Sequence, residues 1–372
     1  MVQIRIAGDR ASLRTFIRLP LTLYRNIPQY VPPVFHDEWH LHDGRGEATR
    51  NCKTIHFLSE ENGKVTGRIM GIIHHDYNKR RNLQTARFFK FDCINDLPTA
   101  SALIAAVEEW AKKEGMDQLI GPFGFSDKDP QGFQIEGFHH RAVISAPSHA
   151  AWMPELIVKL GYLKHVDCLS YQLAIPGQVP AEVQAISNRI LSSGQYRLIR
   201  FHQRSEMKTW ILPVFELVNA TYHQLFGFIP MSNAEMKEMA KQFLPVLDPA
   251  FTVLVTNQQN KPVAFVIAMP DISIGLQKAK GSLFPLGFIH ILRAMNTATQ
   301  LNLLLGAVDP QCRHAGITAI LAVSVLEEAQ RRNMSIIDSH LVLEENPHVR
   351  RVLERFGGKV EKRYRIFSKV LK

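Results

Sequence analysis

The sequence has few cysteines and no long apolar run, and both absences limit what the protein can be. There are only four cysteines, and none belongs to a CxxC pair: Cys52, Cys93, Cys168 and Cys312. Neither a disulfide framework nor a cysteine zinc site is therefore expected. No apolar stretch reaches the roughly 20 residues that a transmembrane helix needs, and the first residues lack the apolar segment of a signal peptide. We expect a cytoplasmic protein without a membrane partner.

Several catalytic signatures are also absent. The sequence contains no G-x-S-x-G nucleophile elbow and no G-x-x-x-x-G-K-(S/T) phosphate loop, so hydrolase and NTPase functions lack their minimal parts. The formal net charge of +10 is compatible with a polyanionic partner. However, the basic residues are spread along the chain, and the best cluster is the short NKRR run at 78–81. A nucleic-acid partner would therefore rest on charge alone.

Length and composition indicate a globular protein of two domains. The chain has 372 residues, of which 46% are hydrophobic and 21% charged, and a chain of this length exceeds one ordinary hydrophobic core. Three segments of the first half recur in order in the second half. Aligning Gly161 with Gly357 gives an offset of 196 residues, and the other two matches give 193 and 197. This near-constant offset indicates an internal duplication.

Each half is predicted to read strand, helix, hairpin, strand, long helix, strand, helix, strand. In the first half we expect strands near 2–7, 54–60, 64–74, 86–94, 117–123 and 163–173, and helices near 11–26, 98–114 and 152–160. In the second half we expect strands near 196–202, 251–256, 262–269, 301–308, 335–343 and 359–371, and helices near 205–226, 233–244, 315–332 and 347–356. The linker AIPGQVP at 174–180 divides the chain into units 1–175 and 176–372.

The segment VDPQCRHAGITAIL at 308–321 is a candidate anion site. It leaves a predicted strand, passes through a polar loop with Arg313 and Gly316, and enters an apolar helix. The first turn of a helix carries unpaired N–H groups and a partial positive charge, and a glycine lets a phosphate approach the backbone closely. The alternative is an ordinary strand-to-helix turn with a surface arginine.

The elements around this loop resemble the C-terminal core of the GNAT acyl-CoA N-acyltransferases. In that superfamily, a pattern (Q/R)-x-x-G-x-(G/A) wraps backbone amides around the pyrophosphate of coenzyme A. Arg313, Gly316 and Thr318 occupy its positions here, with threonine in place of glycine or alanine. The chain as a whole is similar to a family of uncharacterised bacterial tandem-GNAT proteins. The resemblance implies an α/β fold of two tandem GNAT-like units, each a mixed central sheet flanked by helices.

The resemblance also implies acyl-CoA, such as acetyl-CoA, as cosubstrate, and no metal. The expected contacts to acyl-CoA are Ala307, Val308, Arg313, His314, Ala315, Gly316, Ile317, Thr318 and Asn346. A bulky residue at Gly316 is expected to abolish binding and to spare the fold. The corresponding loop of the first half has no glycine and carries Asp92 and Asp96, which would repel a phosphate. The first unit is therefore expected to lack the phosphate loop.

N-acylation needs a base for the amine and an acid for the departing thiolate. Glu344 and Glu345 follow a predicted strand and are candidate bases, although a glutamate there can also serve only the helix dipole. The tyrosine that usually protonates the thiolate in GNAT enzymes is replaced by Leu353. The acid is then Tyr364, His340 or water. A backbone N–H near Ala307 or Val308 is expected to polarise the thioester carbonyl.

Two possible metal sites are weak. The loop SDKDPQGFQIEGF at 126–138 lacks the glutamate that completes an EF-hand, although its mixture of acidic and aromatic groups could hold an amine. The segment HDEWHLHDG carries His36, His40 and His42, and the pairs His74–His75 and His139–His140 follow; His40 with His42 alone do not specify the three or four ligands that zinc needs. Three hypotheses remain: an N-acyltransferase with an unknown amine substrate, a non-catalytic GNAT-fold protein that binds CoA or a polyanion, and an unrelated α/β protein. The oligomeric state is left open.

Overall fold

The computed structural model describes residues 1–42, 44 and 46–371. Its first half contains the following strands and helices: β1 (Gln3–Ile6), α1 (Arg10–Leu23), α2 (Phe35–His42), β2 (Cys52–Glu61), β3 (Lys64–His74), α3 (His75–Arg81), β4 (Thr85–Cys93), α4 (Leu97–Lys113), β5 (Gln118–Gly121), β6 (Phe133–Glu136), α5 (Trp152–Lys159) and β7 (Leu163–Ala174). All nine strands and helices expected in this half are present. The additional α2, α3 and β6 lie in segments that show no clear periodicity.

The second half repeats this order with three additions. Its strands and helices are α6 (Ala181–Ser192), β8 (Tyr196–Arg200), α7 (Arg204–Met207), α8 (Ile211–Tyr222), α9 (Asn233–Phe243), β9 (Thr252–Asn257), β10 (Pro262–Pro270), α10 (Ser273–Ala279), α11 (Gly287–Thr297), β11 (Gln300–Val308), α12 (Ile317–Arg331), β12 (Ile336–Asp338), β13 (Val342–Leu343), α13 (Pro347–Arg355) and β14 (Lys359–Val370). The additions not expected from the sequence are α6, α10 and α11.

Two expected elements of the second half are divided in the structure. The predicted strand 335–343 ends at Asp338 and resumes as β13 at Val342, and the carboxylate of Asp338 makes a buried ion pair with Lys362. The predicted helix 205–226 is broken between α7 and α8 by a 3-10 turn at Lys208–Trp210. Interruptions of this kind depend on local turns and on contacts with distant residues, which the hydrophobic periodicity of the sequence does not reveal.

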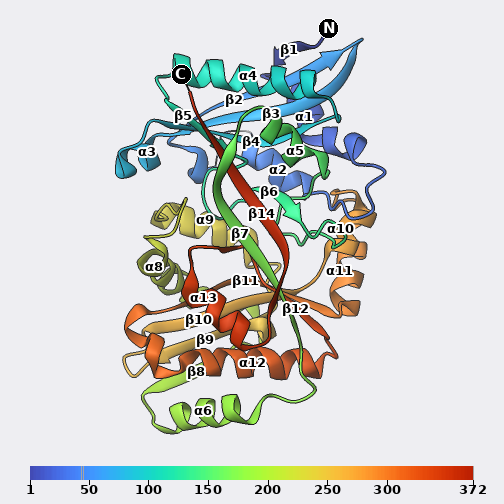
Figure 1. Cartoon of the computed structure of the whole chain (residues 1–372). Coiled ribbons are helices and arrows are strands. Elements are labelled where there is room, and N and C mark those ends of the chain that lie inside the picture. The colour runs from blue at the N-terminus through green and yellow to red at the C-terminus, as the bar shows by residue number, and fades with distance from the viewer. Residues whose placement is uncertain (43, 45, 372) are drawn as a thin grey trace.

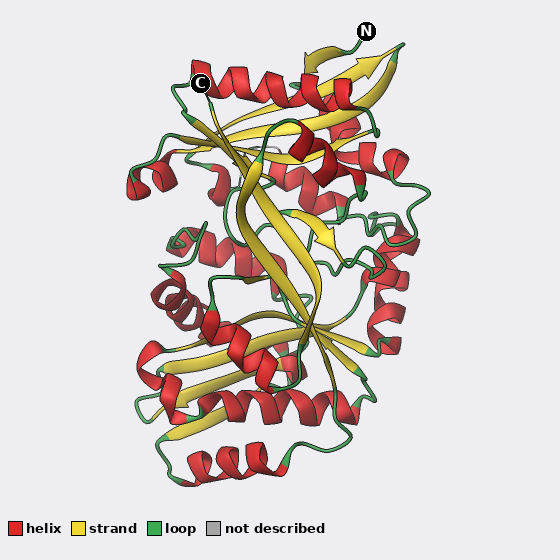
Figure 2. Cartoon of the chain, viewed as in Figure 1, coloured by secondary structure: helices red, strands yellow, loops and turns green. Residues whose placement is uncertain are grey.

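All the strands form one mixed sheet with two wings (Figures 1 and 2). The order is β1-β2-β3-β4-β5-β14-β7-β12-β11-β10-β9-β8, with β6 beside β14 and β13 beside β7. The two closing strands cross between the wings: β14 pairs with β5 of the first half, and β7 pairs with β12 of the second. Each wing is therefore completed by a strand from the other half. The boundary between residues 175 and 176 remains a prediction, and strand pairing crosses it.

Helices cover both faces of each wing, and the inner faces look toward each other. Figure 1 shows α4 on the outer side of the first wing and α12 with α6 on the outer side of the second. Between the wings lie α1, α2, α8, α9, α10 and α11. One apolar core packs α4 and α5 against the first wing, and another packs α12 against the second. In the described part of the chain, no helix is both long and apolar enough to cross a bilayer.

Candidate functional site

The loop singled out in the sequence leads into an uncapped helix. After β11 the chain forms a 3-10 turn over Pro310–Ala315, and Gly316 then precedes α12 with a positive φ of 75°. No side chain caps this end of α12, and its first turn carries no acidic residue. Arg313 is half-buried just before it and makes no hydrogen bond or ion pair with any residue that the structure describes. The N–H groups here are available to an anion.

The equivalent helix of the first half is closed to an anion. At the start of α4 the carboxylate of Asp96 accepts hydrogen bonds from the backbone N of Thr99 (2.8 Å) and its hydroxyl (2.6 Å). A proline, Pro98, removes a further N–H from the first turn. The expected contrast between Asp96 and the uncapped Gly316 is thus visible in the local geometry of the two helices.

Gly316 has a second role that the sequence did not indicate. A Cβ atom at this position would lie 2.9 Å from Cδ1 of Ile190 and 3.1 Å from Cγ2 of Ile186. The added helix α6 therefore packs directly against the loop. A bulky residue here would disturb that packing and would also be strained at positive φ. A substitution at Gly316 would therefore change the packing of α6 as well as ligand binding, so a different probe of the loop is needed.

A split opens in the sheet beside this loop. β11 and β12 pair in parallel only from Gln300–Ile336 to Asn302–Asp338. Beyond that point β11 continues to Val308 beside β10, whereas the chain after β12 turns to pair with β7. One edge of β11 is left without a strand partner over its second half. Such an edge can accept an extended ligand as if it were an added strand.

A bulge and the register of β11 decide which groups face the split. The pairing with β10 jumps between Leu303 and Leu305, so Leu304 is the inserted residue. The N–H of Asp309 donates to the carbonyl of Val263, next to β10, and this bond shows which residues between the bulge and Asp309 direct their backbone groups toward β10 and which direct them away from it. By that alternation Gly306 and Val308 direct their backbone groups toward the split, whereas Ala307 directs its own toward β10. Of the two expected carbonyl-polarising donors, Val308 therefore has the suitable direction.

In the first half, other groups cover the edge of β4 that corresponds to the open edge of β11. There β4 and β5 pair only from Thr85 to Arg87. The next carbonyl of β4, that of Phe88, accepts a hydrogen bond from the N–H of Phe123 at 2.9 Å. Near the end of the strand, the indole of Trp152 donates to the carbonyl of Cys93 at 3.1 Å. The open edge of β11 therefore has no free counterpart on β4.

A tyrosine from α8 reaches the open edge of β11. The hydroxyl of Tyr222 donates a 2.6 Å hydrogen bond to the carbonyl of Gly306. Burial, and next the negative charge of Asp127, raise the pKa of Tyr222. Asp127 belongs to the 126–138 loop of the first half, and burial also raises its own pKa. The sequence does not indicate Tyr222, because this residue lies 84 residues before Gly306 and belongs to no motif.

A pocket of about 210 Å³ lies where the two halves meet. It is lined by His139, His140, Arg141, Val143, Gln172, Asp271, Ser273 and Gln300. Its wall on β11 is a polar network: Asn302 bonds both Gln300 (2.8 Å) and Asp271 (3.0 Å). Gln300, Asn302 and Leu304 alternate along one face of β11, so this inter-half pocket and the bulge lie on the same side of the sheet.

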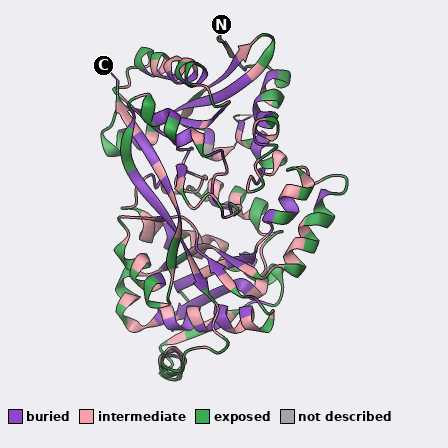
Figure 3. Ribbon diagram, turned by 45° about the vertical axis from the view of Figure 1, so that its right-hand side comes forward, coloured by how far each residue is buried: buried purple, intermediate pink, exposed green. Residues whose placement is uncertain are grey.

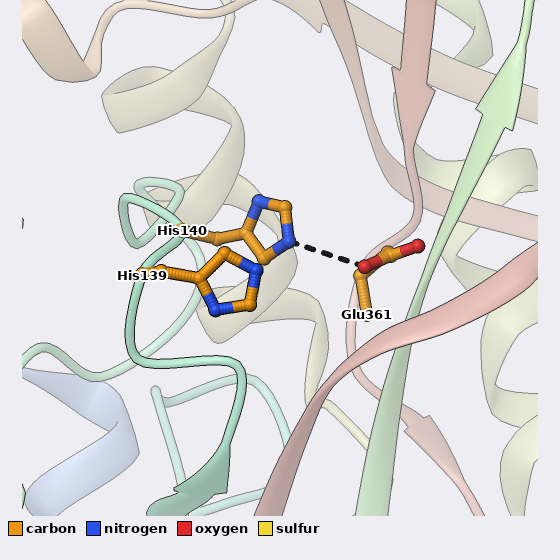
Figure 4. Close-up of side chains that lie close together, drawn as sticks. All are labelled: His139, His140 and Glu361. Atoms are coloured by element: carbon orange, nitrogen blue, oxygen red, sulfur yellow. Dashed lines mark hydrogen bonds and ion pairs between the residues drawn. The ribbon is translucent and has the colours of Figure 1, made fainter.

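Two adjacent histidines and a glutamate form a group at the pocket (Figure 4). Nε2 of His140 lies 3.1 Å from a carboxylate oxygen of Glu361 on β14. His139 lies beside them, and one ligand atom from each of the three residues falls within 4.8 Å of the others. This spacing would suit a metal ion with nitrogen and oxygen ligands. It also suits a histidine base oriented by a carboxylate.

The predicted catalytic residues lie on the side of β7 and β14. Both carboxylate oxygens of Glu344 are engaged, one by the backbone N of Asp167 (3.0 Å) and one by Nζ of Lys164 (2.8 Å). Glu345 is exposed. Tyr364 is fully buried with no partner for its hydroxyl among the described residues, and burial raises its pKa.

The other predicted residues divide between the loop and its surroundings. His314 is exposed, and Ala315 and Thr318 are half-buried in the loop. Ala307 and Ile317 are buried in the flanking cores. Asn346 accepts a 3.4 Å hydrogen bond from the N–H of Val349 and so caps α13. His340 is half-buried, and burial lowers its pKa. Their roles toward a ligand stay predictions.

Comparison with known proteins finds relatives over nearly the whole chain, although no protein-family profile matches it. Protein YghO of Escherichia coli (strain K12) is 27% identical over 374 residues, which covers 98% of this chain and 95% of YghO. A protein named bacterial ceramide synthase, from Caulobacter vibrioides (strain NA1000 / CB15N), is 23% identical over 376 residues, 97% of this chain and 95% of the relative.

Solved structures match along the same length. A tandem GNAT protein from the clavulanic acid biosynthesis pathway, in a structure without AcCoA, superimposes with a TM-score of 0.58 and 13% identity, covering 100% of this chain and 99% of that one. A GCN5-related N-acetyltransferase from Sphaerobacter thermophilus gives a TM-score of 0.54 and 14% identity, covering 100% and 96%.

Proposed function

Because the chain has the tandem GNAT fold, we propose that it is an acyl-CoA-dependent N-acyltransferase with its donor site in the second half. One observation carries the proposal: the open edge of β11 and the uncapped start of α12 adjoin each other, and both features are blocked in the first half. An open strand edge that leads to a free helix N-terminus suits a long ligand with amides at one end and phosphates at the other.

In this proposal the residues of the loop bind the pyrophosphate of acyl-CoA. The backbone N–H groups of Gly316, Ile317 and Thr318, which follow the 3-10 turn, supply donors, and Arg313 supplies a charge-assisted contact. The pantetheine amides pair with Gly306 and Val308 along the open edge. The thioester then lies beside the bulge at Leu304, where the irregular pairing of β11 leaves a backbone N–H to polarise its carbonyl.

The acceptor amine would reach the thioester from the inter-half pocket. Its nitrogen attacks the thioester carbon, a C–N bond forms, the C–S bond breaks, and the amine proton passes to a base. The pair His140–Glu361 is the best-oriented base, because the carboxylate holds the imidazole at 3.1 Å. Glu344 is a weaker candidate, because both its oxygens are engaged.

The departing thiolate needs a proton, and Tyr222 is placed to give it. Its hydroxyl lies on the open edge of β11, at Gly306, along which the pantetheine arm would run. Tyr364, the earlier candidate, is sealed among Val143, Ala146 and Cys168. We therefore propose Tyr222 as the acid in place of the tyrosine that Leu353 replaces.

The relative named bacterial ceramide synthase suggests the class of acceptor. A ceramide is the amide of a fatty acid with a long-chain amino alcohol, so its synthesis is an N-acylation. This chain has apolar walls near the bulge that would suit such substrates: Leu304 packs with Val31, Ala142, Leu276 and Ile291. We propose a long-chain amine as acceptor and a fatty acyl group as donor.

A non-catalytic role in binding CoA or a polyanion is the second candidate, supported by the net charge of +10. One experiment separates the two. The purified protein is incubated with acyl-CoAs of increasing chain length and with short polar amines, polyamines and long-chain amino alcohols, and free thiol is measured. Amine-dependent thiol release that falls in Arg313→Ala supports the enzyme. CoA binding without thiol release for any pair supports the second candidate.

A further inference from the structure

The helical insertion between β10 and β11 exposes an unusual concentration of apolar side chains. This α10–α11 hairpin, residues 271–299, contains six large apolar residues that face solvent: Ile274, Phe284, Leu286, Phe288, Ile289 and Leu292. Phe284 is 80% exposed and Leu286 63%, and the rings of Phe284 and Phe288 are 6.4 Å apart. Figure 3 shows the exposed residues along this hairpin. Contiguous apolar surface of this kind marks an interaction site.

The apolar surface is not a product of loose packing. The other side of α11 already packs on the protein through Gly287, Ile291 and Met295. The hairpin is also fastened to the first half: Nε2 of Gln277 donates to the carbonyls of Pro28 (2.7 Å) and Tyr30 (2.8 Å). The exposed face therefore belongs to an ordered element whose inner side has its own partners.

Beyond Asp271, the charged side chains of the α10–α11 hairpin itself all have one sign. No acidic residue occurs between Asp271 and Asp309, whereas Lys278, Lys280 and Arg293 are all exposed on the hairpin. Exposed Arg18 of α1 lies nearby, because its guanidinium stacks on Phe35 (5.2 Å), whose N–H donates to the carbonyl of Gly281. An apolar face on a hairpin whose charged side chains beyond Asp271 are all basic matches a surface of anionic headgroups over hydrocarbon.

We propose that the α10–α11 hairpin docks this protein on the surface of a lipid bilayer that contains anionic lipids. Phe284, Leu286 and Leu292 enter the boundary between headgroups and acyl chains, and the basic side chains of the hairpin contact the phosphates. This contact needs no spanning segment, so it is compatible with the absence of a long apolar run. A two-fold contact with a second copy fits less well, because it would bring the same basic residues together.

The hairpin also borders the proposed site. Its inner residues Leu276 and Ile291 pack in one cluster with Leu304, the bulge residue of β11. A docked hairpin would therefore place the bulge and its apolar surroundings near the membrane surface. This link to a lipid amine rests on the proposed function, whereas docking itself rests only on the exposed surface and its charge.

Vesicle flotation of the full chain tests the docking. We expect the protein to float with phosphatidylcholine vesicles that hold about one-third phosphatidylglycerol. We expect release at about 0.5 M NaCl and at least about tenfold weaker binding to phosphatidylcholine alone. Leu286→Glu and Leu292→Glu should each weaken binding at least about tenfold, since each buries a charge in the apolar boundary. Circular dichroism confirms that both variants fold.

Val158→Glu is the matched control, because Val158 lies on helix α5 and is 55% exposed, as is Leu292. It should bind vesicles as the unaltered protein does. The proposal is overturned if the unaltered protein does not float, or if Val158→Glu loses as much binding as Leu292→Glu. A dimer in analytical ultracentrifugation that Leu292→Glu dissociates, without vesicle binding, would assign the surface to a second copy. Thiol release with short, water-soluble substrates tests the proposed function separately.

Discussion

A carboxylate at the start of α12 should block the proposed anion site there, as the carboxylate of Asp96 blocks the start of α4 in the first half. Thr318 is the second residue of α12 and is half-buried. In Thr318→Asp the new carboxylate would lie about 5 Å from a bound pyrophosphate. With an effective dielectric constant of about 40–80, each phosphate charge repels it by about 0.8–1.7 kcal/mol. Two charges give about 2–3 kcal/mol, or roughly 30–150-fold in Kd.

The same substitution should stabilise the free protein. A negative charge in the first turn of a helix contributes about 0.3–1 kcal/mol, which corresponds to a rise of about 1–3 °C in Tm. Weaker ligand binding and a higher Tm in one variant is a combination that damage to the fold cannot produce. Thr318→Asn is the matched control, because asparagine has nearly the same size and shape as aspartate and adds no charge.

Calorimetric titration with coenzyme A and thermal melting of the free protein measure both effects. We expect Thr318→Asn to retain affinity within about threefold and Thr318→Asp to lose most of it. If Thr318→Asp binds coenzyme A as tightly as the unaltered protein, the pyrophosphate does not lie at this helix and the donor site has been misplaced.

Four further predictions follow from particular contacts. Arg313→Ala should weaken coenzyme A binding by about 1–3 kcal/mol, with Tm unchanged; equal affinity would remove Arg313 from the site. Tyr222→Phe should lower kcat at least about tenfold and alter its pH profile if the phenol is the acid, whereas a change in KM alone would mean that it only supports Gly306. Lys362→Met should lower the free energy of unfolding in urea by about 3–5 kcal/mol, because it leaves the buried carboxylate of Asp338 without its ion-pair partner. The double variant with Asp338→Leu should recover part of this lost stability. Burial lowers the pKa of His56 to about 3 and the pKa of His74 and His149 to about 4, so the folded protein keeps these histidines neutral while the unfolded chain takes up protons below about pH 6.5. The free energy of unfolding should therefore fall by about 1–2 kcal/mol for each histidine at pH 5. A urea midpoint that does not change between pH 7.5 and pH 5 would contradict this prediction.

Local signals were enough to predict the repeated elements. Alternating β-branched residues and amphipathic spacing gave the hairpin strands β2, β3, β9 and β10 and the long helices α4 and α12 close to their observed ends. The loop from Arg313 to Thr318 could also be singled out, because a glycine between a strand and an apolar helix is a local pattern. The similar order of elements in the two halves was also detectable, because a closing strand follows Gly161 in one half and Gly357 in the other at a similar distance.

Contacts between residues that are distant in the sequence could not be predicted from the sequence. Nothing near Tyr222 indicates that its hydroxyl meets Gly306, and nothing near His140 indicates Glu361, which lies 221 residues away. Nothing in the sequence of helix α6 indicates that Ile186 and Ile190 pack on Gly316. The sequence therefore predicted a plausible donor loop, whereas the proposed acid, base and acceptor pocket depend on how the two wings face each other.

The exchange of closing strands has a consequence for how the chain is made. β14 spans Lys359–Val370 of the second half, yet it fills the place beside β5 in the first wing. During synthesis residues 1–175 leave the ribosome with that edge unpaired, and it stays open until β14 emerges. Open strand edges invite pairing with other chains. The two segments 1–175 and 176–372, produced as separate polypeptides, should each be unstable alone and should recover their fold only when they are produced together.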